Sequence, residues 1–190
     1  MLNPAHVGHL SILRSLIRDG AARGGFVRAL ATDSRETTMF FSNLRRALTT
    51  GYFIEEDPDT GDLNTVAVPG YVYHPDRGGA VSHPIGFGLF KAIRNGYELW
   101  LTGVDAAWRG HGHGRAMMTA LLGTPPGRKA FVVRVQRLGQ DSPAMAHLLA
   151  SFEYTQMNET KSHTWFVRAD APPDLAERIR VDPPVPKSMH

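Results

Sequence analysis

The chain has no cysteine, and this absence excludes several kinds of chemistry. Without thiols there are no disulfides, no thiolate-ligated metal sites and no acyl-cysteine intermediate. Long apolar runs are also missing: no segment reaches about 18 consecutive apolar residues, the length that would suggest a membrane span. The N-terminal segment contains His6, His9 and Asp19 and lacks the apolar stretch of a signal peptide. We therefore expect no membrane partner, and a soluble, unprocessed, cytoplasmic protein.

A strong excess of charge of either sign is missing too, because the net charge is only +3. The positive residues are scattered, so a nucleic-acid partner is not expected, although the balance suits an anionic small ligand. With 190 residues, 42% of them hydrophobic, the chain is long enough to build one sizeable core.

The first half of the chain reads as two helices followed by a hairpin. Apolar residues at helical spacing predict one helix over 7–19 and a second beginning near Asp33, which has capping-box spacing with Glu36. Residues 52–56 and 63–73 predict a β-hairpin whose second arm is interrupted at Pro69 and Gly70. Segment 74–96 contains five glycines and two prolines, so we expect a long structured loop with a helical turn over 87–93.

The second half contains a βαβ unit. Residues 97–104 and 130–135 read as strands on either side of a helix, and a strand, helix and strand within so short a span should make the two strands parallel. A helix beginning at Ser142 and Pro143 and a hairpin over 154–158 and 163–168 follow. The last 22 residues include five prolines, so we expect one domain over 1–168 and an extended tail over 169–190, in which 175–179 is a candidate for one docked helical turn.

Three glycines, Gly110, Gly112 and Gly114, lie where the first βαβ strand becomes a helix. A helix start presents unpaired N–H groups and the positive end of the helix dipole, so it attracts anions. Glycines let a phosphate approach the main chain closely, and Arg109 and Arg115 add positive charge. The spacing is neither a Rossmann fingerprint nor a P-loop, which leaves those nucleotide interpretations weak.

The pattern Arg109-x-x-Gly112-x-Gly114 resembles the R/Q-x-x-G-x-G/A segment of the GCN5-related N-acetyltransferase (GNAT) family. The order of expected elements over about residues 5–168 is similar to that of the family as well. The resemblance implies an α/β (α+β) fold with a mixed, mostly antiparallel sheet and a central parallel βαβ wedge flanked by helices. It also implies acetyl-CoA as co-substrate, its pantetheine lying between two splayed strands. The residues then expected to hold it are Leu101, Thr102, Gly103 and Val104 on the strand and Arg109, Gly110, His111, Gly112, His113, Gly114 and Arg115 in the loop.

Acetyl transfer to an amine is helped by a base, because an alkyl amine is mostly protonated at neutral pH. Glu98 is our candidate, since it matches the glutamate base of the family's histone acetyltransferases. The competing interpretation is a structural glutamate in solvent or paired with an arginine. His74 and His83 are weaker alternatives as the base.

The general acid departs from the family pattern. Many members carry a tyrosine in a segment resembling N-P-A-x-x-x-L-Y-x-x-x-G-F, where this chain has Leu149, with Ser142 and Glu153 in the usual asparagine and glycine positions. Ser151 or Tyr154 could substitute only if the helix is shifted. Otherwise water protonates the thiolate, which is tolerable for a leaving thiol with a pKa near ~8.5.

Three functions remain open at this point. The first is an acetyl-CoA-dependent N-acetyltransferase working by direct transfer in a ternary complex, the second an acyl-CoA-binding sensor without turnover, and the third a nucleotide-binding module. We expect no metal, because alternate histidines such as His111 and His113 rarely complete a site; their side chains should face solvent. The acceptor is an amine that the sequence does not name, and a homodimer is one open oligomeric state.

Overall fold

The local patterns of the sequence become helices and strands in the computed structural model, which describes residues 1–56, 60–75, 83–137 and 139–181. In those ranges the α-helices are α1 (Leu10–Ala22), α2 (Arg35–Thr50), α3 (His113–Leu122), α4 (Ser142–Ala150) and α5 (Pro173–Val181). The strands are β1 (Leu2–Pro4), β2 (Tyr52–Glu56), β3 (Leu63–Ala67), β4 (Gly70–Tyr73), β5 (Gly86–Ile93), β6 (Gly96–Val104), β7 (Ala130–Gln136), β8 (Tyr154–Glu159) and β9 (His163–Arg168).

Seven strands form one sheet in the order β1-β4-β5-β6-β7-β9-β8, and β2 and β3 form a separate two-stranded sheet. Every neighbouring pair is antiparallel except β6 and β7, which α3 connects as a parallel crossover. The expected mixed, mostly antiparallel sheet with a central βαβ unit is therefore confirmed. The interruption of the predicted hairpin is also confirmed, because β3 ends at Ala67 and β4 begins at Gly70.

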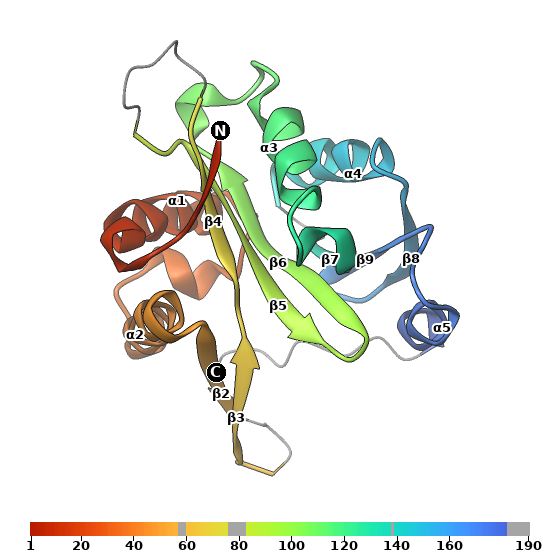
Figure 1. The fold of residues 1–190 in the computed structure, drawn as a ribbon, viewed down its shortest axis with the longest axis horizontal. Coiled ribbons are helices and arrows are strands. Elements are labelled where there is room, and N and C mark those ends of the chain that lie inside the picture. The colour runs from red at the N-terminus through yellow and green to blue at the C-terminus, as the bar shows by residue number, and fades with distance from the viewer. Residues whose placement is uncertain (57–59, 76–82, 138, 182–190) are drawn as a thin grey trace.

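Helices cover both faces of the sheet (Figure 1). One core cluster joins α1 and α2 to β5 and β6, and a second joins α3 and α4 to the other side of β5, β6, β7 and β9. A third cluster lies under α5, where Leu175 and Ile179 pack against Val132, Trp165 and Val167 of β7 and β9. On β7 and β9, Val132 and Val167 face the opposite side of the sheet from their neighbours Val133 and Phe166, which belong to the second cluster. Helix α5 therefore covers the face opposite α4.

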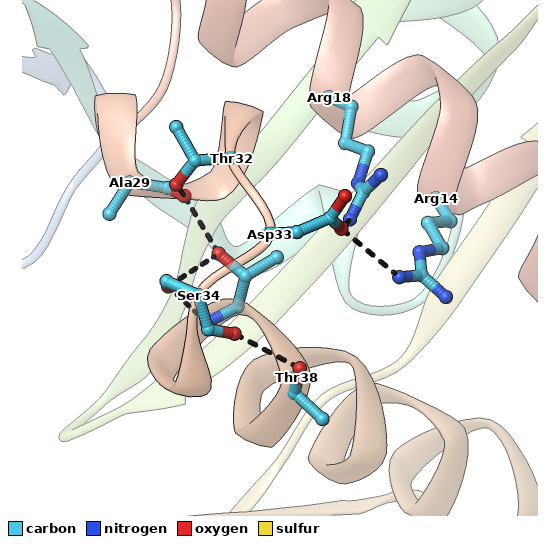
Figure 2. A network of polar contacts seen from close by, with 8 residues as sticks. Arg14, Arg18, Ala29, Thr32, Asp33, Ser34 and Thr38 are labelled. Atoms are coloured by element: carbon cyan, nitrogen blue, oxygen red, sulfur yellow. Dashed lines mark hydrogen bonds and ion pairs between the residues drawn. The ribbon is translucent and has the colours of Figure 1, made fainter.

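The corner between α1 and α2 is held by polar contacts (Figure 2). Ser34, not Asp33, caps α2, and its hydroxyl accepts a hydrogen bond from the Thr37 amide at 3.2 Å. Asp33 instead pairs with Arg18 and lies 3.9 Å from Arg14, both on α1. The carboxylate therefore ties the helices together instead of forming the expected capping box.

The expected loop over 74–96 is wrong for its second half, which forms the eight-residue strand β5, with no helical turn at 87–93. A Cβ atom on Gly86 would lie 2.7 Å from Met117 Sδ, and one on Gly88 would lie 2.6 Å from the Leu121 methyl groups. The two glycines thus let α3 pack directly on the strand. Residues 76–82, which also belong to the expected loop, lie outside the described residues.

The expected extended tail is wrong for Pro173–Val181, which forms α5, a longer helix than the single docked turn expected at 175–179. Leu175 and Ile179 are one helical turn apart and almost fully buried, so the helix completes a core cluster. Proline at position 173 is compatible with this, because proline is tolerated at the first helical position. Residues 182–190 lie outside the described residues.

Candidate active site

The parallel strands β6 and β7 separate from one another along their length. They pair only at Tyr97↔Ala130, Glu98↔Val132 and Leu99↔Val133, although β6 continues to Val104 and β7 to Gln136. A bulge adds to the divergence, because Leu89 pairs with Leu101 and Phe90 with Leu99, which leaves Trp100 as the extra residue. The result is a wedge in the sheet whose closed end lies at Leu99.

A cleft of about 1590 Å³ follows this wedge. It extends from the glycine loop before α3, along the ends of β6 and β7, to α2 and the β2–β3 sheet. Pockets for a single small ligand usually measure about 300 to 1,000 Å³, so this cleft has room for a long cofactor and a second molecule.

The glycine loop presents main-chain donors at one end of the cleft. Gly110 and Gly112 have φ angles of 77° and 82°, in the left-handed region that favours glycine, and Gly112 caps α3. A Cβ on either residue would have no described atom within 4 Å, so the loop surface is open. The first bond of the helix runs from the Ala116 amide to Gly112 O at 3.1 Å, and the N–H groups before it lack intrahelical partners. These features fit the diphosphate of a nucleotide cofactor.

Arg109 has a different local role from the one the pattern suggests. Its Nε donates to Val104 O at 2.9 Å, Nη1 to Asp141 at 2.6 Å and Nη2 to Asp19 at 3.1 Å. The guanidinium therefore ties the loop to β6, α1 and the segment before α4, and two carboxylates already balance its charge. Arg115, which is exposed and lies over the Phe152 ring at 5.8 Å, keeps its charge available at the loop.

The structure divides the remaining expected cofactor residues into two groups. His111 is exposed as expected, but His113 is half-buried and contacts the rings of Trp108 and Tyr73, so the expectation that it faces solvent is wrong. The expected residues that line the cleft are Leu101, Thr102, Gly103, Val104, Arg109, Gly110 and Gly114, whereas His111, Gly112, His113 and Arg115 lie beside it.

Glu98 lines the cleft one residue before the wedge opens, and it is paired with Arg134 of β7. Arg134 Nε donates to one Glu98 oxygen, and Nη2 donates to the other at 3.1 Å. The Arg134 guanidinium also lies 5.1 Å from the centre of the Trp165 ring. The structure therefore shows Glu98 paired with an arginine, which was the competing interpretation. The role of Glu98 as a base stays a prediction.

A second polar group beside this pair was missed in the sequence. Gln136 Nε2 lies 2.9 Å from His163 Nε2, and Ser162 Oγ lies 2.8 Å from His163 Nδ1. Burial and, secondarily, the positive charge of Arg134 lower the pKa of His163 to about 4, so the imidazole is neutral at neutral pH. Neither His74 nor His83 is among the described residues that line the cleft.

The position of the family's general acid holds a residue with no acidic proton, and the two possible substitutes are engaged elsewhere. Leu149 is fully buried in the core, and the Tyr154 hydroxyl donates to Ala130 O. Burial raises the pKa of Tyr154 to about 12. The exposed Ser151 hydroxyl donates to Leu148 O at 2.7 Å. Among these residues, none offers an unengaged acidic group to the cleft.

Similarity to known proteins is found in the structure and not in the sequence. No protein-family profile and no curated protein matches the sequence. Among solved structures, the PaiA N-acetyltransferase of Thermoplasma acidophilum, in complex with coenzyme A, is similar at 14% identity and a TM-score of 0.58, over 88% of this chain and 97% of that one. YncA of Salmonella typhimurium, assigned as an acetyltransferase and solved with acetyl-CoA, has 14% identity and a TM-score of 0.54, covering 87% and 91%.

A third structure, assigned as an acetyltransferase of the GNAT family from Bacteroides thetaiotaomicron, has 12% identity and a TM-score of 0.57, covering 94% of this chain and 95% of that one. The chain therefore has the fold of the GCN5-related N-acetyltransferases, as its glycine pattern predicted. Over the described part of the chain, no helix has the length and apolar character needed to cross a bilayer.

Proposed function

We propose that this protein is an acetyl-CoA-dependent N-acetyltransferase that acts by direct transfer in a ternary complex. The observation that carries the proposal is the continuous cleft, which joins a glycine-built helix start to the Glu98–Arg134 pair at the closed end of the wedge. Similar folds are solved with coenzyme A or acetyl-CoA. The chain has no cysteine, so an acyl-cysteine intermediate is excluded, and this supports direct passage of the acyl group to the acceptor.

The glycine loop would hold the diphosphate through the main-chain N–H groups before Ala116. The main chain of residues 100–104 on β6 has no β7 partner, so it can pair with the pantetheine amides. In the reaction the amine nitrogen bonds to the thioester carbonyl carbon and the carbon–sulfur bond breaks. The nitrogen loses one proton and the thiolate gains one.

Glu98 is the residue that we assign to the proton leaving the amine, because it is the carboxylate at the closed end of the wedge. Both of its oxygens accept from Arg134, so a proton would reach it through a cleft water or as the pair rearranges. Water protonates the thiolate, since Leu149 has no proton to donate and the buried Tyr154 hydroxyl donates to Ala130 O.

The experiment combines calorimetry with coenzyme A and an assay of thiol release from acetyl-CoA over a panel of primary amines. Binding together with amine-dependent thiol release supports the transferase. Binding without release from any amine would instead identify an acyl-CoA sensor. Protection by ATP or NAD in the absence of coenzyme A binding would overturn both.

A further inference from the structure

Arg134 has a second hydrogen-bonding edge that the Glu98 pair does not use. A guanidinium carries five N–H donors in a planar fork, and each of its edges fits a carboxylate. The Nε and Nη2 atoms engage Glu98. Nη1 donates to no other residue within the described ranges, which leaves the edge formed by Nη1 and Nη2 for a ligand.

This arginine is held rigidly beside the cleft. Its side chain is 16% exposed, and it lies between the Glu98 carboxylate and the Trp165 ring. Trp165 is itself 2% exposed and packed by Leu175 and Ile179 of α5. An arginine fixed in this way loses little conformational freedom when a ligand binds, which favours selective recognition.

The two walls of this part of the cleft differ in charge. On the wall of β7 and α5, Arg134 already neutralises Glu98. The exposed Arg178 and the neighbouring exposed Arg94 have no ion pair within the described residues, so positive charge is in excess. On the wall of α2 and the β2–β3 sheet, Glu55 pairs with Lys91 at 2.5 Å. The other charged residues of that wall are Arg35, Glu36 and Glu56, which give it a small negative excess.

The geometry points to an acceptor that carries a carboxylate close to its amine, such as a free α-amino acid, with Arg134 as the residue that selects it. This inference rests on the proposed transferase function and names its substrate class. The carboxylate would bind the open edge of Arg134, and the amine would lie toward the acidic wall and Glu98. A peptide N-terminus would offer a neutral carbonyl at that place, which is a weaker partner for a guanidinium.

The experiment compares amino acids with their own α-amides as acceptors. L-Phenylalanine, L-methionine and L-leucine are suitable probes, because Phe40, Phe53 and Trp100 make part of the cleft apolar. Conversion of the carboxylate to an amide also changes the basicity of the amine. The measured quantity is therefore kcat/KM for the amino acid divided by kcat/KM for its amide, compared between the unmodified protein and each variant. Arg134→Lys should reduce this ratio by about tenfold or more, mainly through the KM of the acid. Arg137→Lys, at an arginine paired with Glu159 outside the cleft, should leave it unchanged.

A binding measurement on the unmodified protein protects the test against a variant that does not fold. With coenzyme A present, N-acetyl-L-phenylalanine should bind about tenfold or more tightly than N-acetyl-L-phenylalaninamide by calorimetry. Equal binding, an unchanged ratio in a folded Arg134→Lys variant, or turnover of amides and peptides but of no amino acid would each overturn the inference. Absence of thiol release with every amine would instead contradict the proposed function.

Discussion

The two ends of the cleft are built in different ways. The end that we propose for the cofactor diphosphate is built from main-chain groups of seven consecutive residues, 109–115, whose conformation depends on local glycines; we call it the cofactor end. The end that we propose for the acceptor, called the acceptor end, is built from side chains of β6, β7 and β9 and is supported by a helix near the C-terminus. A local substitution should therefore disturb one end at a time, whereas loss of a distant segment should damage the acceptor end first.

The largest effect is expected from removing α5 by truncation at Ala171. Leu175 and Ile179 are 2% and 1% exposed, and losing two such side chains should cost about 3 to 6 kcal/mol of the free energy of unfolding. Chemical denaturation measures this loss. Because Trp165 supports Arg134, the acceptor KM should rise more than the Kd for coenzyme A. Unchanged stability would show that the helix does not complete the core.

The next largest effect is expected from Glu98→Gln. If Glu98 takes up the proton, turnover at neutral pH should fall by about 10² to 10⁴, and the deficit should shrink as pH rises because more amine is already deprotonated. The Kd for coenzyme A should change little. The variant should also unfold more easily, because Arg134 loses a charged partner.

Glu159→Gln is the matched control for this substitution, since it breaks an ion pair with Arg137 that lies outside the cleft. A rate deficit in Glu98→Gln that does not vary from pH 6 to pH 9 would leave Glu98 only the task of positioning Arg134.

The contrast between the two ends also explains what could be predicted from the sequence. The strand, glycine turn and helix around Gly112 follow one another in the chain, so local pattern was sufficient. The Glu98–Arg134 pair joins residues 36 positions apart, and only strand pairing brings them together. The sequence signal that could have revealed this pair was a single charged residue in each of two otherwise apolar strands that were predicted to be parallel.

The error at β5 has the same physical origin. Gly86 and Gly88 look like loop residues, but their function is to make room for Met117 and Leu121 about 30 residues later. Tertiary packing thus overrode local preference there. The length of α5 was underestimated for a similar reason. The prolines around it indicated an extended chain with one docked turn at most, whereas Leu175 and Ile179 find partners on β7 and β9 that stabilise a nine-residue helix.

A pH effect of intermediate size is expected at the acceptor end. The pKa of His163 is about 4 in the folded protein and about 6.5 when exposed, so the unfolded chain binds more protons between these values. Stability from the neutral imidazole is therefore present above about pH 6.5 and is lost as pH falls toward 4. Because solvent partly screens this imidazole, the loss should be on the order of 2 kcal/mol. His163→Gln should flatten this dependence relative to the unmodified protein in denaturation measured at pH 7, 5.5 and 4.5; parallel curves would contradict it.

A smaller effect should be confined to the cofactor end. Gly112→Val should weaken coenzyme A binding by about 1 to 3 kcal/mol, because the side chain obstructs the open loop surface and valine disfavours a φ of 82°. Gly51→Val is the matched control: Gly51, the residue after α2, has the same φ of 82°, an added Cβ would likewise meet no described atom within 4 Å, and the residue does not line the cleft. It should lower stability to a similar extent and leave coenzyme A affinity nearly unchanged. Equal affinities by calorimetry in the two folded variants would remove the loop from the binding site.

The smallest effect is expected from Glu153→Gly, which lies outside both ends of the cleft. Glu153 occupies the position where the similar segment of the family carries glycine. Its φ of 63° shows that the backbone keeps the left-handed conformation here although the residue is not glycine. A non-glycine residue pays about 1 kcal/mol for this conformation, so glycine should raise the free energy of unfolding by about that amount. Denaturation midpoints measure the gain, and the Kd for coenzyme A and the acceptor KM should not move. Destabilisation by glycine would mean that the Glu153 side chain makes a favourable contact that outweighs the strain of its backbone.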